Sequence, residues 1–246
     1  RFWERKCLNR ASSIFFVTEQ KRTLYRNTFP LLKNHNCHVI PQGWNSEIPR
    51  QPGTHQYLSV NSDCIMSFIG HPTPAIPIKS FILSLRNVAR KRPDLARRLI
   101  LKIVGRCDDE TRRDVALLDG IMRYHIHQPV PHHQAVGEIE NSHILILLNN
   151  VAYPGVTPLK FYDYMASDRP ILVWGAMGNS GDVINSCKAG IVVDEYDIIS
   201  LESALDLFLI TPFFAWETEA RKLWREQNST EQCINRMISC INNDSL

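Results

Sequence analysis

Short apolar segments alternate along most of the chain with segments whose apolar residues recur every three or four positions. The apolar runs at 64–69, 99–104 and 143–148 are rich in Ile, Leu and Val, and they do not alternate with polar residues. Runs of this kind are typical of strands that are covered on both faces of a sheet. The same pattern predicts further strands at 121–126, 170–174 and 191–193.

The spacing of the intervening apolar residues predicts helices. In residues 79–90, for example, Phe81, Ile82, Leu85 and Val88 fall on one helical face. Further helices are predicted at 108–118, 132–140, from Pro158 onward, at 182–186 and at 200–209. Strands that alternate with helices predict an α/β fold with a doubly wound, Rossmann-like parallel sheet.

Both ends of the chain lie outside this succession. Helices are predicted at 2–10 and 19–28, and strands at 14–17 and 37–40. We therefore expect residues 1–45 to be the end of a preceding α/β domain with its linker, and residues 46–212 to be one ligand-binding domain. Residues 213–246 are expected to form amphipathic C-terminal helices. Because the chain starts at Arg1 without a signal-peptide pattern, we expect it to be a fragment.

Composition narrows the choice of partners. The formal net charge of +3 over 246 residues is too small to favour nucleic acid as the main partner. No apolar run approaches the roughly 20 residues that span a bilayer. Seven cysteines are scattered without a CxxC pair, which predicts reduced thiols and a cytoplasmic location.

The segment 155–166 carries the most informative chemistry. Thr157 is expected to cap a helix whose first residue is Pro158, at the carboxyl edge of the sheet. Such a helix start binds anions, and Lys160 would offer its ammonium to an open cleft there. Asp163, three residues later, can accept hydrogen bonds from hydroxyl groups. The alternative is a capped helix in which Lys160 and Asp163 form a surface ion pair.

The residues from 158 to 172, PLKFYDYMASDRPIL, resemble the "P.K..EYMA.GKPVL" segment of GT-B-fold glycosyltransferases of the large family-4-like group. The turn before the last strand differs, since Asp168 and Arg169 replace the family's Gly-Lys. Other segments match in the same order along the chain, namely residues 11–19, 38–45, 65–71 and 101–105. The chain thus resembles the C-terminal, donor-binding half of such an enzyme with a remnant of the N-terminal domain.

This resemblance implies that the domain binds a nucleotide-diphosphate sugar without a metal or other cofactor. The helix start at Thr157 would bind phosphate, and Asp163 would bind the ribose hydroxyls. Family members often carry a pair of glutamates. The second corresponds to Asp163, and the first lies eight positions earlier, where this chain has Gly155. The residues implied in donor binding are Gly70, His71, Lys79, Arg106, Val130, Gly155, Val156, Thr157, Lys160 and Asp163.

Three of these assignments have structural alternatives. Lys79 is also compatible with a solvated helix residue, and His71 and Arg106 with ordinary loop positions. No catalytic residue is assigned, because in this fold the acceptor is held by the N-terminal domain, most of which is missing. The implied activity is transfer of a sugar to a carbohydrate or lipid-linked acceptor, with the fragment alone inactive. A nucleotide-sugar epimerase and a non-catalytic partner subunit remain alternatives.

Three further sequence patterns could indicate other kinds of binding site. His125, His127, His132 and His133 could suggest a metal, but no cysteine or carboxylate follows at the spacing of a metal site. Basic residues at 86–98 are expected to be solvated, and they leave peripheral contact with the inner face of a membrane open. The glycine-rich stretch 175–181 lacks a GxGxxG pattern and is expected to be a loop near the site.

Overall fold

The computed structural model describes residues 2–47, 62–72, 76, 78–149, 155–175 and 178–244, without the side chain of Asn34. Six strands of this part form one parallel sheet, which confirms the predicted α/β fold. They are β3 (Cys64–Ile69), β4 (Leu99–Val104), β5 (Arg123–His127), β6 (Ile144–Leu148), β7 (Ile171–Trp174) and β8 (Gly190–Val193).

The strand order is β5-β4-β3-β6-β7-β8, so the direction of winding reverses between β3 and β6. Leu145 of β6 pairs with Ser67 of β3 on one side and with Ile171 of β7 on the other. In open parallel sheets, ligands bind beyond the carboxyl ends of the strands at such a reversal. The topology therefore places the candidate site at the ends of β3 and β6.

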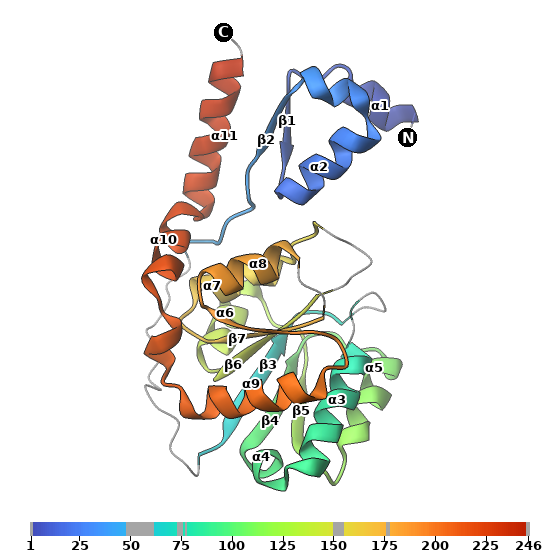
Figure 1. Cartoon of the computed structure of the whole chain (residues 1–246), viewed down its shortest axis with the longest axis vertical. Coiled ribbons are helices and arrows are strands. Elements are labelled where there is room, and N and C mark those ends of the chain that lie inside the picture. The colour runs from blue at the N-terminus through green and yellow to red at the C-terminus, as the bar shows by residue number, and fades with distance from the viewer. Residues whose placement is uncertain are drawn as a thin grey trace.

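Seven helices of the described chain cover the two faces of the sheet (Figure 1). Alternate residues of β3 point to opposite faces, so Phe68 packs with α3 and α9 while Ile69 packs with α7 and α8. The helices are α3 (Ile78–Lys91), α4 (Pro93–Arg98), α5 (Asp109–Val115), α6 (His132–Glu140), α7 (Leu159–Ala166), α8 (Asn179–Ser186) and α9 (Ile198–Ile210). A single 3-10 turn, η2 (Ala116–Leu118), follows α5.

The helix α4 was not predicted. Pro93 stands in its first turn, where its missing N–H leaves no backbone group unpaired. Helix α8 begins at Asn179 rather than near residue 182, because Gly178 takes the extended conformation of an N-cap residue. The other predicted elements of the sheet domain are confirmed within a few residues at their ends.

The N-terminal residues form a small unit with its own two-stranded sheet. Its elements are α1 (Phe2–Leu8), β1 (Ser13–Phe16), α2 (Glu19–Thr28), η1 (Pro30–Asn34) and β2 (Asn36–Val39). The strands β1 and β2 are parallel, and Ile14, Phe16, Phe29, Leu32 and Cys37 form a separate core. The boundaries of the predicted domains stay predictions.

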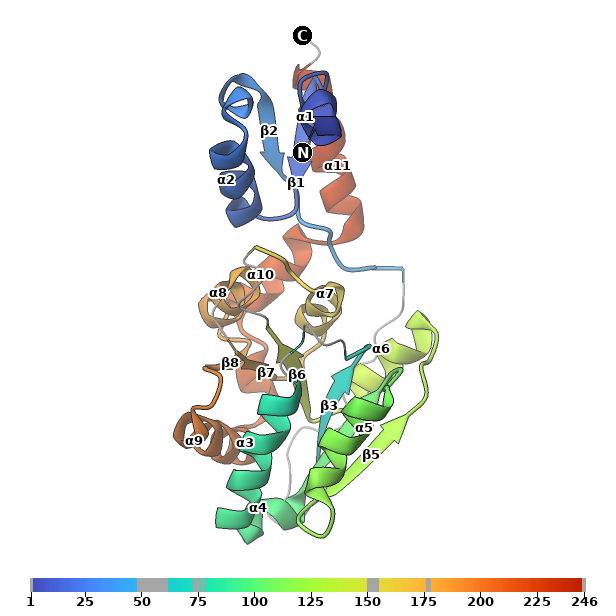
Figure 2. The ribbon, with the colours of Figure 1, turned by 90° about the vertical axis from the view of Figure 1, so that its right-hand side faces the viewer.

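After η3 (Phe213–Trp216), α10 (Glu219–Gln227) and α11 (Thr230–Asp244) return the chain to this N-terminal unit (Figure 2). The Asp244 carboxylate accepts hydrogen bonds from Ser13 Oγ at 2.6 Å and is 2.7 Å from His38 Nε2. Trp44, which follows β2, also contacts the C-terminal helices, since its indole Nε1 donates a hydrogen bond to the Arg225 carbonyl of α10 at 2.9 Å. The last helix thus connects the two sheets.

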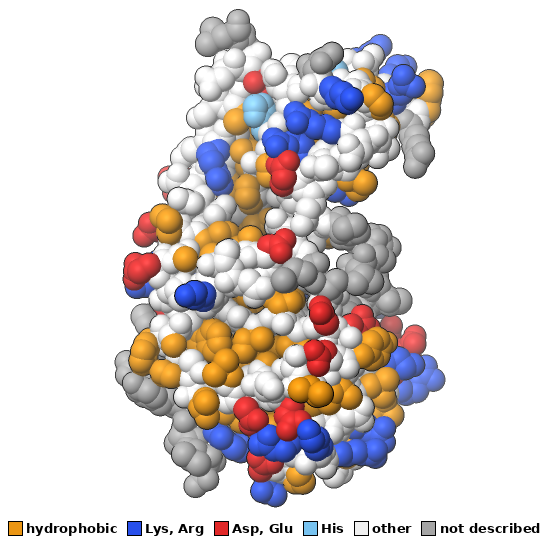
Figure 3. Space-filling view, in the orientation of Figure 1, with side chains coloured by type: hydrophobic (Ala, Val, Ile, Leu, Met, Phe, Trp, Pro, Cys, Tyr) orange, Lys and Arg blue, Asp and Glu red, His pale blue; other side chains and the backbone are white. Residues whose placement is uncertain are grey.

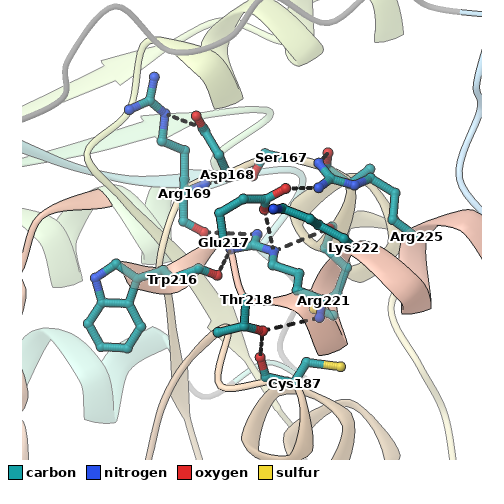
Figure 4. A network of polar contacts seen from close by, with 12 residues as sticks. Ser167, Asp168, Arg169, Cys187, Trp216, Glu217, Thr218, Arg221, Lys222 and Arg225 are labelled. Atoms are coloured by element: carbon teal, nitrogen blue, oxygen red, sulfur yellow. Dashed lines mark hydrogen bonds and ion pairs between the residues drawn. The ribbon is translucent and has the colours of Figure 1, made fainter. Parts of the chain in front are cut away.

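Helix α10 is fixed to the end of α7 by a buried arginine (Figure 4). Arg221 has no exposed surface, and its guanidinium donates to four carbonyl oxygens. The acceptors are Met165 O at 3.2 Å, Trp216 O at 3.1 Å, Tyr164 O at 2.7 Å and Arg169 O at 3.0 Å. Because the carbonyls that end a helix lack intrahelical partners, this arginine completes the C-terminus of α7.

Candidate functional site

Glycines end three of the strands at the edge where the candidate site lies. Gly70 follows β3 with φ of +134°, a backbone conformation that other residues rarely adopt. Gly105 follows β4, and a Cβ atom added there would lie 1.9 Å from the Gly70 carbonyl oxygen. The ends of β3 and β4 can therefore approach this closely only because Gly105 lacks a side chain.

Lys160 of α7 reaches the end of β3. Its Nζ lies 3.5 Å from the centroid of the Phe68 ring, and a Cβ atom added to Gly70 would lie 2.9 Å from it. The Nζ atom is buried and has no hydrogen-bond partner among the described residues. Burial lowers the pKa of Lys160 from its ordinary value to about 7.

The prediction of an ammonium offered to an open cleft is therefore wrong in its detail. The amine lies at the predicted edge of the sheet, but it is folded back over an aromatic ring. The aliphatic stem and the ring bury apolar surface together, and the cation interacts with the ring face. A buried amine without a hydrogen-bond acceptor costs free energy in the folded chain.

The start of α7 also differs from the prediction. The helix begins at Leu159, and Pro158 rather than Thr157 is the residue before its first turn. Pro158 has φ of −62° and ψ of 143°, which is extended, so the helical conformation begins one residue later than expected. Thr157 does not cap the helix, and its hydroxyl instead accepts a hydrogen bond from Asn179 Nδ2 at 3.0 Å. The first N–H groups of α7 are still without intrahelical partners.

Gly155 occupies the position of the family's first glutamate and contacts the N-terminal unit. Its carbonyl accepts a hydrogen bond from Thr18 Oγ1 at 2.8 Å. Its φ is +80°, and an added Cβ atom would lie 3.1 Å from Gln20 Cβ and from Lys21 N. A glutamate could not take this position without strain and movement of α2. The neighbouring Val156 is exposed.

Asp163 lies one helical turn after Lys160, and it does not form the alternative ion pair with that residue. Its Oδ2 is 2.9 Å from Nε2 of His132, the first residue of α6. Val130, two residues before His132, packs partly buried against the core cluster that includes Phe161. The loop between β5 and α6 thus lies beside α7.

His71, Lys79 and Arg106 are the remaining charged or polar candidates. Among the described residues, no hydrogen bond joins these three to Lys160 or Asp163. His71 Nδ1 interacts with the Arg106 carbonyl, so the loops after β3 and β4 adjoin. Lys79 is mostly exposed, and its Nζ lies 3.8 Å from Asp114 Oδ1. A phosphate contact of Lys79 and Arg106, and donor binding by His71, stay predictions. The predicted loop residues Asn150, Tyr153, Pro154, Ala176 and Met177 lie outside the described residues.

Other predicted features of the surface take structural roles. Lys and Arg side chains at the end of the molecule near α4 stand among acidic ones (Figure 3). Arg92 pairs with Asp94, Glu202 and Asp206, and this ties α4 to α9. In the described part of the chain, no group of three or more His, Cys, Asp and Glu could hold a metal ion. No helix of that part is long and apolar enough to cross a membrane.

A cavity of about 640 Å³ opens at the other edge of the sheet. It is bounded by the end of α3, the start of α4 and the turn before β5, and it contains none of the predicted donor-binding residues. The lining includes Ala89, Arg90, Pro93, Ile121 and Met122. Since ligands of doubly wound sheets bind at the carboxyl edge, we place the candidate site at Lys160 and not in this cavity.

The fold is shared with several solved structures. A variant of S. aureus TarM, in complex with fondaparinux, alpha-GlcNAc-glycerol and UDP, is 17% identical with a TM-score of 0.75. It matches 98% of this chain, which spans 46% of TarM. Sucrose-phosphate synthase from Thermosynechococcus elongatus is 18% identical over 98% of this chain and 60% of its own, with a TM-score of 0.73. No family model and no curated protein matches the chain.

These neighbours are GT-B glycosyltransferases. The chain has their Rossmann-like GT-B fold. An α,α-trehalose 6-phosphate synthase from Burkholderia multivorans, 11% identical, shares it over 98% of this chain with a TM-score of 0.72. This chain spans 61% of that protein. At such low identities the similarity establishes the fold, and the activity must be argued from the residues of the site.

Sequence reasoning missed His132 as a neighbour of Asp163. It was considered only as part of a histidine cluster, because the two residues are 31 positions apart and belong to different helices. In the sequence Phe68 is likewise an ordinary apolar strand residue, although its ring contacts the Lys160 amine in the structure. Only the pairing of β3 with β6, which brings α7 over the end of β3, reveals either contact.

Proposed function

We propose that this chain is the donor-binding portion of a glycosyltransferase that uses a nucleotide-diphosphate sugar. The observation that carries the proposal is the buried Lys160 amine without a hydrogen-bond partner in the described chain, at the point where the winding of the sheet reverses. An anionic oxygen is the partner that such an amine lacks. The shared fold with GT-B glycosyltransferases supports the same function.

In this proposal each residue has a distinct task. Lys160 and the first N–H groups of α7 bind the diphosphate, and they stabilise the negative charge that grows on it as the sugar departs. Asp163 binds the ribose hydroxyls, and backbone groups near Val130 contact the base. The glycines at 70 and 105 let the backbone approach the ligand closely. No metal is needed for these roles, because the cationic side chain and the helix start supply positive charge.

The acceptor would be a hydroxyl of a carbohydrate or of a lipid-linked molecule, held by an N-terminal domain of which this chain would supply only the last elements. TarM supports a carbohydrate class, since one of its complexes contains UDP together with fondaparinux. Donor binding without transfer is therefore expected for the isolated chain. Product analysis without an acceptor separates this function from an epimerase, and light scattering with a pull-down separates it from a partner subunit.

The first test is a calorimetric titration of UDP, ADP, GDP and inorganic pyrophosphate. One of the three nucleotides is expected to bind, and Asp163→Asn is expected to weaken that nucleotide about tenfold, the typical value of one charged hydrogen bond. Pyrophosphate affinity should stay within twofold, because it has no ribose. Glu231→Gln, an exposed change on α11, is the matched control. Absence of binding by every nucleotide would overturn the proposal.

A second prediction concerns pH. Because the pKa of Lys160 is about 7 in the free chain, a bound diphosphate should raise it, and binding should take up a proton. Affinity is then expected to fall as the pH rises from 7.5 to about 9, by at most about tenfold per pH unit. Titrations in buffers of different ionisation enthalpy would count the protons. A flat profile over this range would contradict a role for Lys160.

A further inference from the structure

His132 stands beside the candidate ribose-binding carboxylate. Its Nε2 is 2.9 Å from Asp163 Oδ2, and its side chain is 52% exposed whereas that of Asp163 is 17% exposed. The histidine, at the start of α6, is thus the more exposed partner of the pair. This contact joins the loop that follows β5 to the helix that follows β6, on the two sides of the reversal in the sheet.

The hydrogen bond from His132 takes up one acceptor site of the Asp163 carboxylate. A carboxylate has about four acceptor sites, so a bond from the imidazole N–H is compatible with two more from ribose. The same bond fixes the rotation of the carboxylate and so reduces the freedom that is lost when a ligand binds. A carboxylate on a helix would otherwise sample several rotamers.

The other ionisable groups of α6 are directed elsewhere. Glu138 forms an ion pair with Lys102 of β4, and His133 is exposed without a contact to Asp163 in the described chain. Among the side chains of α6 and α7, the hydrogen bond that joins the two helix starts is the one between His132 and Asp163. His133 therefore offers a neighbouring histidine as an internal control.

We propose that His132 is a positioning residue that orients the Asp163 carboxylate toward the ribose 2′ and 3′ hydroxyls and so makes the site select ribonucleotides. The inference rests on the proposed function, since it assumes that a nucleoside diphosphate binds at this edge. It goes beyond that function by assigning ribose selectivity to a pair of residues, and by assigning to His132 a role that requires no contact with the ligand.

The test compares UDP, ADP and GDP with their 2′,3′-dideoxy forms on the whole chain. His132→Ala should weaken the preferred ribonucleotide about tenfold and its dideoxy form less than twofold. His132→Gln, whose amide nitrogen can take the place of Nε2, should restore affinity to within about threefold. His132→Asn places its amide nitrogen nearer to Nδ1 and should not. His133→Ala should leave both affinities unchanged.

Each outcome decides the question. A similar loss for ribo and dideoxy forms, or a failure of His132→Gln to restore what His132→Ala loses, would overturn the positioning role. Inorganic pyrophosphate reports on folding, because a correctly folded His132→Ala chain must bind it as the wild type does. If the wild-type chain binds no nucleotide, the proposed function fails and this inference fails with it. If the wild type binds nucleotides but its preference for ribose is unaffected by His132, this inference alone fails.

Discussion

Lys160→Met is expected to make the chain more stable and to weaken nucleotide binding about 10- to 100-fold. Methionine keeps an unbranched apolar stem over the Phe68 ring but removes the amine that has no hydrogen-bond partner in the described chain. The loss of affinity follows from removal of a charged donor to the diphosphate. The gain in stability follows because a buried, unpaired amine no longer has to be desolvated.

The gain should depend on pH in a definite direction. In the folded chain the pKa of Lys160 is about 7, below its ordinary value of 10.5, so the unfolded chain binds more protons between these values. The wild-type chain therefore gains stability as the pH rises from about 7 toward 10.5, and it carries the full penalty below 7. The advantage of the methionine variant should be largest at pH 6 and smallest near pH 10.

Thermal unfolding of both chains between pH 6 and pH 10 measures this effect. Each kcal/mol should raise the Tm by about 2–4 °C in a chain of this size. Lys222→Met, which replaces an exposed lysine of α10 that pairs with Glu219, is the control and should change little at any pH. A variant less stable than the wild type at pH 6 would show that Lys160 stabilises the fold. A variant that binds UDP, ADP or GDP as well as the wild type does would show that the Lys160 amine does not bind the nucleotide.

The succession of elements could be predicted because it is a property of local sequence. Buried strands such as Ile171–Trp174 are continuous runs of apolar residues, and this one is followed by a glycine, Gly175. Helix α6 was predicted at its observed bounds for the same reason, since apolar residues repeat along one of its faces. Parallel order and winding follow from the alternation of strands and helices.

The site was less predictable, because its chemistry depends on contacts between distant segments. The sequence placed Lys160 at the correct edge, but the burial of its amine depends on Phe68 and Gly70, about 90 positions earlier. The predicted cap at Thr157 is absent because α7 begins one residue later than expected, and Asn179 of α8 donates a hydrogen bond to the Thr157 hydroxyl. Local propensity could not anticipate that contact.

Gly155 shows how the N-terminal unit and the site constrain each other. The resemblance marked it only as a missing glutamate, whereas the structure shows a left-handed backbone pressed against the start of α2. Thr18, which also caps α2 through the Lys21 N–H, donates its hydroxyl proton to the Gly155 carbonyl. One threonine thus couples the loop before α7 to the start of α2 in the N-terminal unit.

Arg221→Met is expected to lower the free energy of unfolding by about 3 kcal/mol or more, since it leaves buried carbonyl groups unpaired. The guanidinium makes four hydrogen bonds, among them those to Tyr164 O and Met165 O at the end of α7. Methionine fills part of the space but offers no donor. The measurement is urea unfolding monitored by circular dichroism, with Lys222→Met as the control on the same helix.

Arg221→Lys should recover only a small part of this loss, because an ammonium cannot reproduce the planar set of donors that contacts four carbonyls. The neighbouring Arg225 donates to Ala166 O at 2.9 Å, so the end of α7 would keep one partner in either variant. Full stability in Arg221→Lys would mean that charge near the helix terminus matters rather than the individual bonds. Because α7 carries Lys160 and Asp163 on its first two turns, loosening of its last turn should also weaken nucleotide binding, and by less than Lys160→Met does.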